Sequence, residues 1–504
     1  MSDVQIERAN ASFIRIYTED DGIRKTVYEH FTYHEPGFVK NKWTKWNGEV
    51  KLFKLRGNLL PYGCLQMMLE LCKANGWTYE LDSAFKEDIT KVTRQELADW
   101  VKTLDLRTAG MPIDPYDYQM EAIYLGIKFS RMVVLAATSA GKSLIAYMLT
   151  RYYEMLSNDD GKKILILVPS QMLVDQMYSD FKDYSSANGW DVVSNVHTIM
   201  EGKPKNANKM VYISTWQSIY EEDEEYFKQF GRIINDETHL ASGKSITTIM
   251  NHATNAYQRV GMTGTLKAEK IHPILVMSLF GPIKRVVTTR QLIDAGRATD
   301  VYIKMFQLNY PEEERVHVSE CKYQPEIEFL VGHKHRNKVI ATLAASVKGN
   351  TLVMFDRLEH IENVRLVLEG MKHGKTVYVI TGDVNKDERA AIKAIAERDD
   401  GVIVLGTSGC VSTGLSIKKL RNLVFAHPSK SIIKILQAVG RILRLHTDKG
   451  DANVYDMVDN FSYNDKPNYA LKHALERWAI YKEAEMPITF KTIEMQTSMS
   501  QVEK

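Results

Sequence analysis

The fold class of this 504-residue chain is decided by the stretch Met132–Ser143, which reads MVVLAATSAGKS. Its first half is a continuous apolar run, as expected of a strand that is buried on both faces. A loop of small residues follows, ends in Gly-Lys-Ser, and opens the segment Leu144–Leu156, which has helical periodicity. A strand, a small-residue loop and a helix in this order predict a phosphate-binding loop, or P-loop.

The chemistry of this loop follows from the start of its helix. Backbone N–H groups there point at an anion, and the helix dipole adds to their field. In this pattern the lysine reaches the β- and γ-phosphates and the serine places its hydroxyl on Mg²⁺. The first glycine of the consensus is replaced by Ala136. We therefore expect ATP to be bound by Thr138, Ser139, Ala140, Gly141, Lys142 and Ser143.

A second chemical signal, Asp236-Glu237-Thr238-His239, stands at the end of the apolar run Arg232–Asn235. A carboxylate at the carboxyl end of a strand beside a P-loop can hold Mg²⁺ through a water. Asp236 and Ser143 are therefore the predicted Mg²⁺ ligands. Glu237 can orient or deprotonate an attacking water. His239 can relay between the nucleotide site and a second lobe.

Similar strand patterns recur on both sides of these motifs. Short runs rich in Val and Ile are each followed by a polar loop and a helix-length segment, which predicts parallel sheets built from βαβ units. Five runs, a gap and five more runs predict two similar lobes. The runs are Met132–Ala137, Ile164–Val168, Met210–Ser214, Arg232–Asn235, Arg259–Met262, Thr351–Phe355, Thr376–Ile380, Val402–Leu405, Asn422–Ala426 and Asn453–Met457.

The pattern divides the chain into five parts. Residues 1–95 are expected to form a small α+β domain that binds DNA, residues 96–290 the first lobe and residues 346–460 the second. Residues 291–345 contain prolines and the charge run Glu312–Arg315, and are expected to form a linker with a polar insertion. Residues 461–504 are expected to form a helical tail, with a helix over Tyr469–Glu485.

Composition excludes several classes of protein. Lys+Arg is 65 and Asp+Glu is 63, so the net charge of +2 gives no general basic excess. The four cysteines have no CxxC spacing, which argues against a zinc site or a redox pair. No secretory signal and no membrane-spanning stretch stand out. We therefore expect a soluble, cytoplasmic protein with no membrane partner.

A third motif lies in the second lobe, at Gln437–Arg444 (QAVGRILR). In a helix Gln437, Arg441 and Arg444 share one face, which suits an anion. An arginine finger must be carried by a rigid element and inserted when a cleft closes. Arg441 and Arg444 are the candidates for this role. The alternative is that they form an exposed basic helix face.

Aromatic and basic residues alternate near the N-terminus. Between Phe38 and Arg56 there are six basic residues and one acidic residue, Glu49. Basic residues can neutralise phosphates and aromatic residues can stack on exposed bases. The alternative is that the tryptophans are core residues and the lysines solvate a face. The candidate DNA contacts are Lys40, Lys42, Lys45, Trp43 and Trp46.

Together, Lys142, Asp236–His239 and Gln437–Arg444 resemble motifs I, II and VI of superfamily-two helicases of the DExH group. Alanine at the first P-loop position is common among nucleic-acid-dependent motor ATPases. Further matches follow in order: Tyr118-Gln119, Val168-Pro169-Ser170, Ser214-Thr215-Trp216-Gln217, Thr263-Gly264-Thr265, Gly406-Thr407-Ser408 and Ser412-Thr413-Gly414. The usual acidic residue after the last Thr-Gly is missing, and Ser416 stands nearby.

The resemblance also implies roles for these positions. Gln119 would read adenine, and Gly414 would contact ATP. His239, Thr263, Thr265 and Gln437 would couple the ATP site to movement. Pro169, Thr215 and Thr407 would contact DNA. Glu237, Asp236, Lys142, Arg441 and Arg444 would carry the catalysis.

Within the superfamily the chain is similar to phage helicases of recombination and repair. That resemblance implies an α/β fold of two tandem RecA-like parallel-sheet lobes with a small α+β N-terminal domain. It implies an ATP- and Mg²⁺-dependent translocase, acting as a monomer on branched, single- and double-stranded DNA in the host bacterial cytoplasm. RNA in hybrids stays open as a partner. The alternatives are an RNA helicase, or an ATP-gated DNA-binding or annealing factor without processive unwinding.

Overall fold

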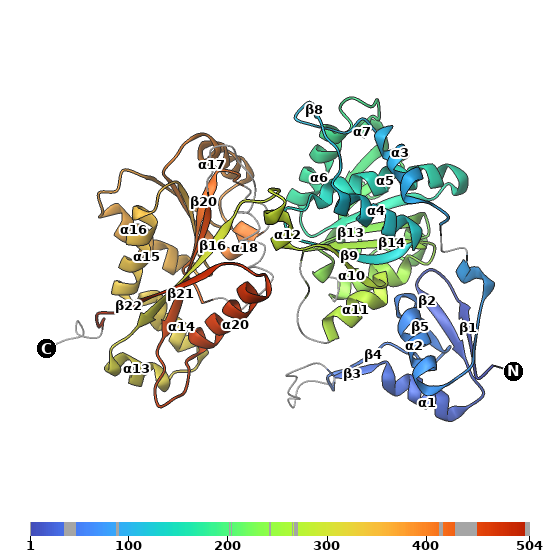
Figure 1. Cartoon of the computed structure of the whole chain (residues 1–504), viewed down its shortest axis with the longest axis horizontal. Helices are drawn as coiled ribbons and strands as arrows, with labels where there is room; N and C mark the ends of the chain where they lie inside the picture. Colours follow the sequence, from blue (N-terminus) through green and yellow to red (C-terminus); the bar gives the residue numbers. More distant parts are fainter. Residues whose placement is uncertain are drawn as a thin grey trace. The chain divides into compact units, whose positions relative to one another are not determined.

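The computed structural model describes residues 2–34, 47–86, 90–200, 202, 204–240, 243–264, 266, 271–412, 417–428 and 451–498 (Figure 1). The chain divides into two compact units, Met1–Val287 and Thr288–Lys504, which are treated separately below. No helix within the described ranges is long and apolar enough to cross a membrane.

The first unit begins with a small α+β domain. Its four-stranded sheet has the order β5-β2-β1-β6, in which β1 pairs antiparallel with β2 and parallel with β6. The side chain of Asp20 caps α1 by accepting hydrogen bonds from two backbone N–H groups of its first turn. The elements are β1 (Val4–Arg8), β2 (Phe13–Tyr17), α1 (Asp21–His30), β3 (Thr32–His34), β4 (Glu49–Lys51), β5 (Leu59–Pro61), η1 (Tyr62–Cys64), α2 (Leu65–Asn75), β6 (Tyr79–Leu81) and η2 (Ser83–Lys86).

This domain packs tightly against the rest of the first unit. Arg259 Nη2 donates to Ser12 Oγ at 2.8 Å, and the guanidinium of Arg131 lies 4.2 Å from the centroid of the Tyr62 ring. A Cβ atom on Gly63 would lie 1.9 Å from the carbonyl oxygen of Met277, so only glycine fits at that position. The two parts therefore share a close interface.

The remainder of the first unit is a lobe built on seven parallel strands in the order β11-β12-β10-β13-β14-β9-β15. Figure 1 shows α4 and α5 on one side of this sheet and α10 and α11 on the other. The elements are α3 (Arg94–Lys102), β7 (Arg107–Thr108), β8 (Met111–Pro112), α4 (Asp117–Lys128), β9 (Arg131–Ala136), α5 (Lys142–Asp160), β10 (Lys163–Val168), α6 (Gln171–Tyr184), α7 (Val192–Asn195), β11 (Val196–Ile199), β12 (Val211–Thr215), α8 (Trp216–Ile219), α9 (Glu224–Phe227), β13 (Phe230–Asp236), η3 (Thr238–Leu240), α10 (Lys244–His252), β14 (Gln258–Thr263), α11 (Ile271–Phe280) and β15 (Ile283–Val287).

The second unit is a second lobe with seven parallel strands, in the order β18-β19-β17-β20-β21-β16-β22. Helices α14, α15 and α16 bury their apolar faces in one core with the sheet. The elements are α12 (Thr289–Asp294), β16 (Val301–Asn309), α13 (Glu312–Ser319), α14 (Tyr323–Gly332), α15 (Lys334–Ser346), β17 (Asn350–Phe355), α16 (Leu358–Glu369), β18 (Thr376–Ile380), α17 (Lys386–Arg398), β19 (Val402–Thr407), α18 (Ser408–Ser412), β20 (Leu420–Phe425), β21 (Ala452–Asn460), α20 (Tyr469–Glu483) and β22 (Ile488–Glu494).

The two parallel-sheet lobes and the small α+β domain confirm the predicted fold class. Each of the ten predicted apolar runs lies on a strand, and the predicted helix near the C-terminus is α20. The sequence patterns did not predict β11, β15, β16 and β22.

Residues 291–345 differ from the expected linker with a polar insertion. They supply β16, which lies between β21 and β22, and the helices α13, α14 and α15. The prolines of this region mark helix starts, since Pro311 is the N-cap residue of α13. In the charge run, Glu314 is fully buried and lies 3.1 Å from His333. The segment is therefore part of the second lobe, as is the tail that forms β22.

Candidate active site

The P-loop lies at the carboxyl end of β9, between that strand and α5. Ser139 and Gly141 both have positive φ, of 71° and 74°, which curls the loop so that α5 begins at Lys142. Gly264 comes directly after β14 and lies against the loop, since a Cβ atom there would be 3.1 Å from Thr138 Oγ1. The loop therefore has the strand–loop–helix context that phosphate binding requires.

Gln119 lies buried behind this loop and is bonded to it. Its Nε2 donates to the carbonyl oxygen of Ala140 at 2.9 Å, and its Oε1 accepts from the backbone N–H of Tyr116 at 2.9 Å. A Cβ atom on Gly141 would approach Gln119 Nε2 to 2.5 Å, and the φ of 74° also favours glycine at this position. The side-chain amide thus supports the P-loop.

The acidic motif leaves the sheet at the carboxyl end of β13. Asp236 is the last residue of the strand, and Glu237 turns the chain with a φ of 53°. Burial and the neighbouring charge of Glu237 raise the pKa of Asp236 to about 6, although the charge of Lys142 opposes this. The structure therefore brings the P-loop lysine and both carboxylates into one electrostatic site.

His239 joins the acidic motif to the end of β14. Its Nδ1 lies 2.9 Å from Thr263 Oγ1 and 3.1 Å from Glu237 Oε2, and its side chain is buried. Thr238 Oγ1 also donates to the carbonyl of Met262 at 3.1 Å. These contacts place His239 and Thr263, two of the predicted coupling residues, side by side.

The donor set at this edge fits a magnesium ion. Asp236 Oδ1 is buried and has no hydrogen-bond partner, which is costly unless a cation or a bound water takes that place. No group of three His, Cys, Asp or Glu side chains in the described ranges is arranged to hold a metal alone. A hard cation here would thus use Asp236, the hydroxyl of Ser143 and oxygens of the substrate phosphates.

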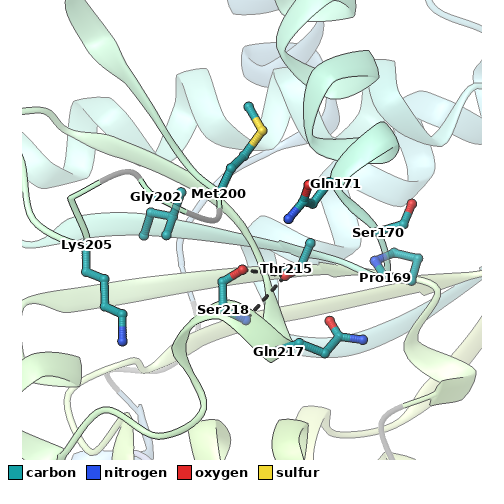
Figure 2. A pocket seen from close by; sticks show the side chains of 10 residues that line it. Pro169, Ser170, Gln171, Met200, Gly202, Lys205, Thr215, Gln217 and Ser218 are labelled. Atoms are coloured by element: carbon teal, nitrogen blue, oxygen red, sulfur yellow. Dashed lines mark hydrogen bonds between the residues drawn. The ribbon is translucent and has the colours of Figure 1, made fainter. Parts of the chain in front are cut away.

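A pocket of about 510 Å³ opens at the same edge of the sheet, beyond β10 and β12 (Figure 2). Pro169, which follows β10, and Thr215, the last residue of β12, both line it. Thr215 Oγ1 accepts from the backbone N–H of Ser218 at 3.3 Å, which fixes the start of α8. Figure 2 also shows the long side chain of Lys205 on the wall.

Two polar contacts at this edge were not predicted from the sequence. Lys205 forms an ion pair with Glu222 across the loops, and Tyr184 bonds to the Ser143 hydroxyl. The only local signal in the sequence is the basic stretch Gly202-Lys203-Pro204-Lys205. Neither pair is close in sequence, so no motif could have shown it.

The remaining residues of the predicted site lie in the second unit or outside the described ranges. Thr407 ends β19 in the second unit. Phe53, one of the aromatics in the N-terminal basic segment, is buried in the core of its domain and cannot stack on bases. Other predicted residues lie outside the described ranges, namely Lys40, Lys42, Trp43, Lys45, Trp46, Thr265, Gly414, Gln437, Arg441 and Arg444.

Two family descriptions match this chain. Residues 112–268 match the type III restriction enzyme res subunit, and residues 334–446 match the helicase conserved C-terminal domain. The chain is also similar to the ATP-dependent DNA helicase UvsW of Enterobacteria phage T4. The two are 32% identical over 518 residues, which cover 98% of this chain and 100% of the phage protein.

Solved structures give the same result. The crystal structure of T4 UvsW matches with a TM-score of 0.52 and 29% identity, over 98% of this chain and 99% of that one. The ATP-dependent type ISP restriction-modification enzyme LlaBIII, bound to DNA, matches with a TM-score of 0.55 and 16% identity. That match covers 77% of this chain and 32% of that one, and shows a shared fold.

Proposed function

Since this chain belongs to the family of ATP-dependent DNA helicases that includes T4 UvsW, we propose that it translocates on branched DNA and remodels it. Its settings would be recombination, repair and replication restart. The proposal rests on one observation: Lys142, Asp236 and His239 lie at one edge of the first sheet. The pocket lined by Pro169 and Thr215 opens at the same edge.

Each residue of the nucleotide site has a separate task in this proposal. Lys142 and the backbone N–H groups of the P-loop hold the phosphates, and Ser143 with Asp236 would hold Mg²⁺. When bound, the ion would supply positive charge against the negative charge that develops on the phosphates. Glu237 orients the attacking water and accepts its proton. Arg441 and Arg444 would stabilise the transition state from the second lobe.

The DNA contacts belong to the edge beside this site. Pro169 and Thr215 line a pocket in which the hydroxyl groups of Thr215 and Ser218 suit phosphate and sugar rather than base edges. Lys205 stands on the same wall, where it is paired with Glu222. We propose that this pocket holds one strand by its backbone, with Thr407 serving the second lobe. Sequence would then not be read.

Strand displacement on a forked duplex tests the proposal. The intact chain should separate a labelled strand when ATP and Mg²⁺ are present, and Lys142→Ala should not. ATP turnover without displacement would favour a DNA-binding or annealing factor instead. Displacement on an RNA fork but not on a DNA fork would favour an RNA helicase. We also propose that the protein acts as a monomer in the host bacterial cytoplasm. Gel filtration of the chain, alone and bound to the fork, measures the oligomeric state.

A further inference from the structure

The Ser143 hydroxyl, which would ligate Mg²⁺, is hydrogen-bonded to Tyr184. Ser143 Oγ lies 2.9 Å from Tyr184 Oη. Tyr184 is the last residue of α6, and its ring packs 5.6 Å from the ring of Tyr147, centroid to centroid. Tyr147 lies one turn along α5 from Ser143 and also contacts Phe181 and Trp190. The phenol is therefore held in place by an aromatic cluster rather than by the hydroxyl that it contacts.

The phenol can take either role in its hydrogen bond with Ser143. A protonated phenol has one O–H donor and lone pairs that accept. Tyr184 can therefore either donate to Ser143 Oγ or accept a hydrogen bond from it.

Metal binding selects between these two directions. A serine hydroxyl that ligates a cation uses an oxygen lone pair, so its own proton needs an acceptor on another side. Tyr184 Oη stands at hydrogen-bond distance for this purpose. Groups that hold metal ligands in this way commonly tune metal affinity.

We propose that Tyr184 is a positioning residue of the nucleotide site: it accepts the Ser143 proton and thereby turns a Ser143 lone pair toward Mg²⁺. This inference rests on the proposed function, because it needs Ser143 to be a metal ligand. It adds a residue that lies 41 positions away in the sequence and belongs to no helicase motif named above.

The test is Tyr184→Phe, which removes one oxygen and keeps the ring. The affinity of the full chain for ADP is measured by calorimetry, once with Mg²⁺ and once with EDTA. We expect the affinity for ADP with Mg²⁺ to fall about three- to tenfold, the effect of one hydrogen bond, and the metal-free affinity to stay unchanged. Tyr178→Phe, on the same helix, is the matched control and should change neither value.

A double-mutant cycle separates positioning from packing. In a Ser143→Ala background, Tyr184→Phe should have no further effect on the affinity with Mg²⁺. An equal loss of affinity with and without Mg²⁺ would show a packing role and overturn the proposal. An unchanged affinity for ADP with Mg²⁺ would also overturn the proposal. A tighter affinity would overturn it too, because it would show that the phenol competes with the metal. If the parent chain binds ADP no better with Mg²⁺ than without, it is the proposed metal site that fails.

Discussion

At the scale of single residues, Asp236 carries its charge at a cost to the fold. Burial and the charge of Glu237 raise its pKa from 3.8 to about 6. Between these two values the folded chain holds a proton that the unfolded chain has released. The free energy of unfolding therefore falls as pH rises through this window. At neutral pH the ionised Asp236 therefore destabilises the fold, and a bound cation would offset this cost.

Asp236→Asn should stabilise the chain in the absence of nucleotide and metal. A shift of about two pKa units corresponds to ~3 kcal/mol at most, so we expect a gain of about 1–3 kcal/mol at pH 7 and a smaller one at pH 5. Urea unfolding at both pH values measures this. Asp300→Asn, at an exposed position, is the control. A variant less stable than its parent at pH 7 would contradict the account.

The contact between His239 and Thr263 gives a prediction about coupling. Thr263→Val keeps the shape of the side chain but removes the hydroxyl that lies 2.9 Å from His239 Nδ1. We expect ATP turnover to persist and the number of strands separated per ATP to fall at least about fivefold, the low end of coupling free energies between sites. Parallel turnover and displacement assays measure this ratio.

Thr248→Val, on α10, makes the same chemical change away from the site and should leave the ratio unchanged. A loss of turnover and displacement in equal measure would show that Thr263 serves hydrolysis itself and not its coupling to movement.

Residue chemistry could be predicted where it follows the chain closely. The proximity of Lys142 and Asp236 could be predicted, because Asp236 ends one apolar strand, the P-loop follows another, and parallel strands end at one edge of a sheet. Tyr184 and Lys205 were missed because their partners are distant in sequence. Gln119 was expected to read adenine, and its bond to the P-loop carbonyl depends on how α4 packs against the loop.

At the scale of elements, burial explains which strands could be predicted. Strands such as β9 and β17 are buried along their whole length and read as unbroken apolar runs. In β16 buried residues are interspersed with residues that are mostly only partly buried, and β22 is an exposed edge strand that contains Thr489, Lys491 and Thr492. Polar residues at such positions interrupt the apolar run, because one face or one edge of the strand contacts water. The strand is then not predicted from the sequence pattern.

Buried charges explain why residues 291–345 read as polar. Arg336, on α15, bonds Asp459 of β21 through Nε and Nη2 at 2.7 and 2.9 Å, and both side chains are fully buried. Tyr310 also donates to Asp459 at 2.7 Å. Composition alone predicts that such charged residues are exposed. Here their hydrogen bonds connect residues 291–345 to the core of the second lobe.

Asp459→Ala should therefore destabilise the second lobe strongly. It leaves the guanidinium of Arg336 buried without its carboxylate, which typically costs about 3–5 kcal/mol. Calorimetry of the full chain measures the change in the unfolding transition. Asp399→Ala breaks the exposed pair with Arg398 and should change stability little. If the two substitutions lowered the stability equally, the buried pair would contribute no more to stability than an exposed one.

At the scale of the whole molecule, the small N-terminal domain belongs with the first lobe. Ser12 is bonded to Arg259, and Gly63 has no room for a side chain beside Met277. DNA contacts made by this domain would therefore follow the movement of the nucleotide-binding lobe. The basic residues that the structure describes there are partly engaged, since Lys51 pairs with Glu49 and Lys54 lies over the Phe13 ring.

The central claim is that ATP is consumed at the P-loop in order to move DNA. Steady-state ATP hydrolysis tests it, with forked DNA, single-stranded DNA, RNA or no nucleic acid, for the parent chain and for Lys142→Ala. We predict that DNA stimulates turnover, that the fork does so most strongly, and that Lys142→Ala abolishes it under every condition. Full turnover by Lys142→Ala, or no response of the parent chain to DNA, would contradict the account.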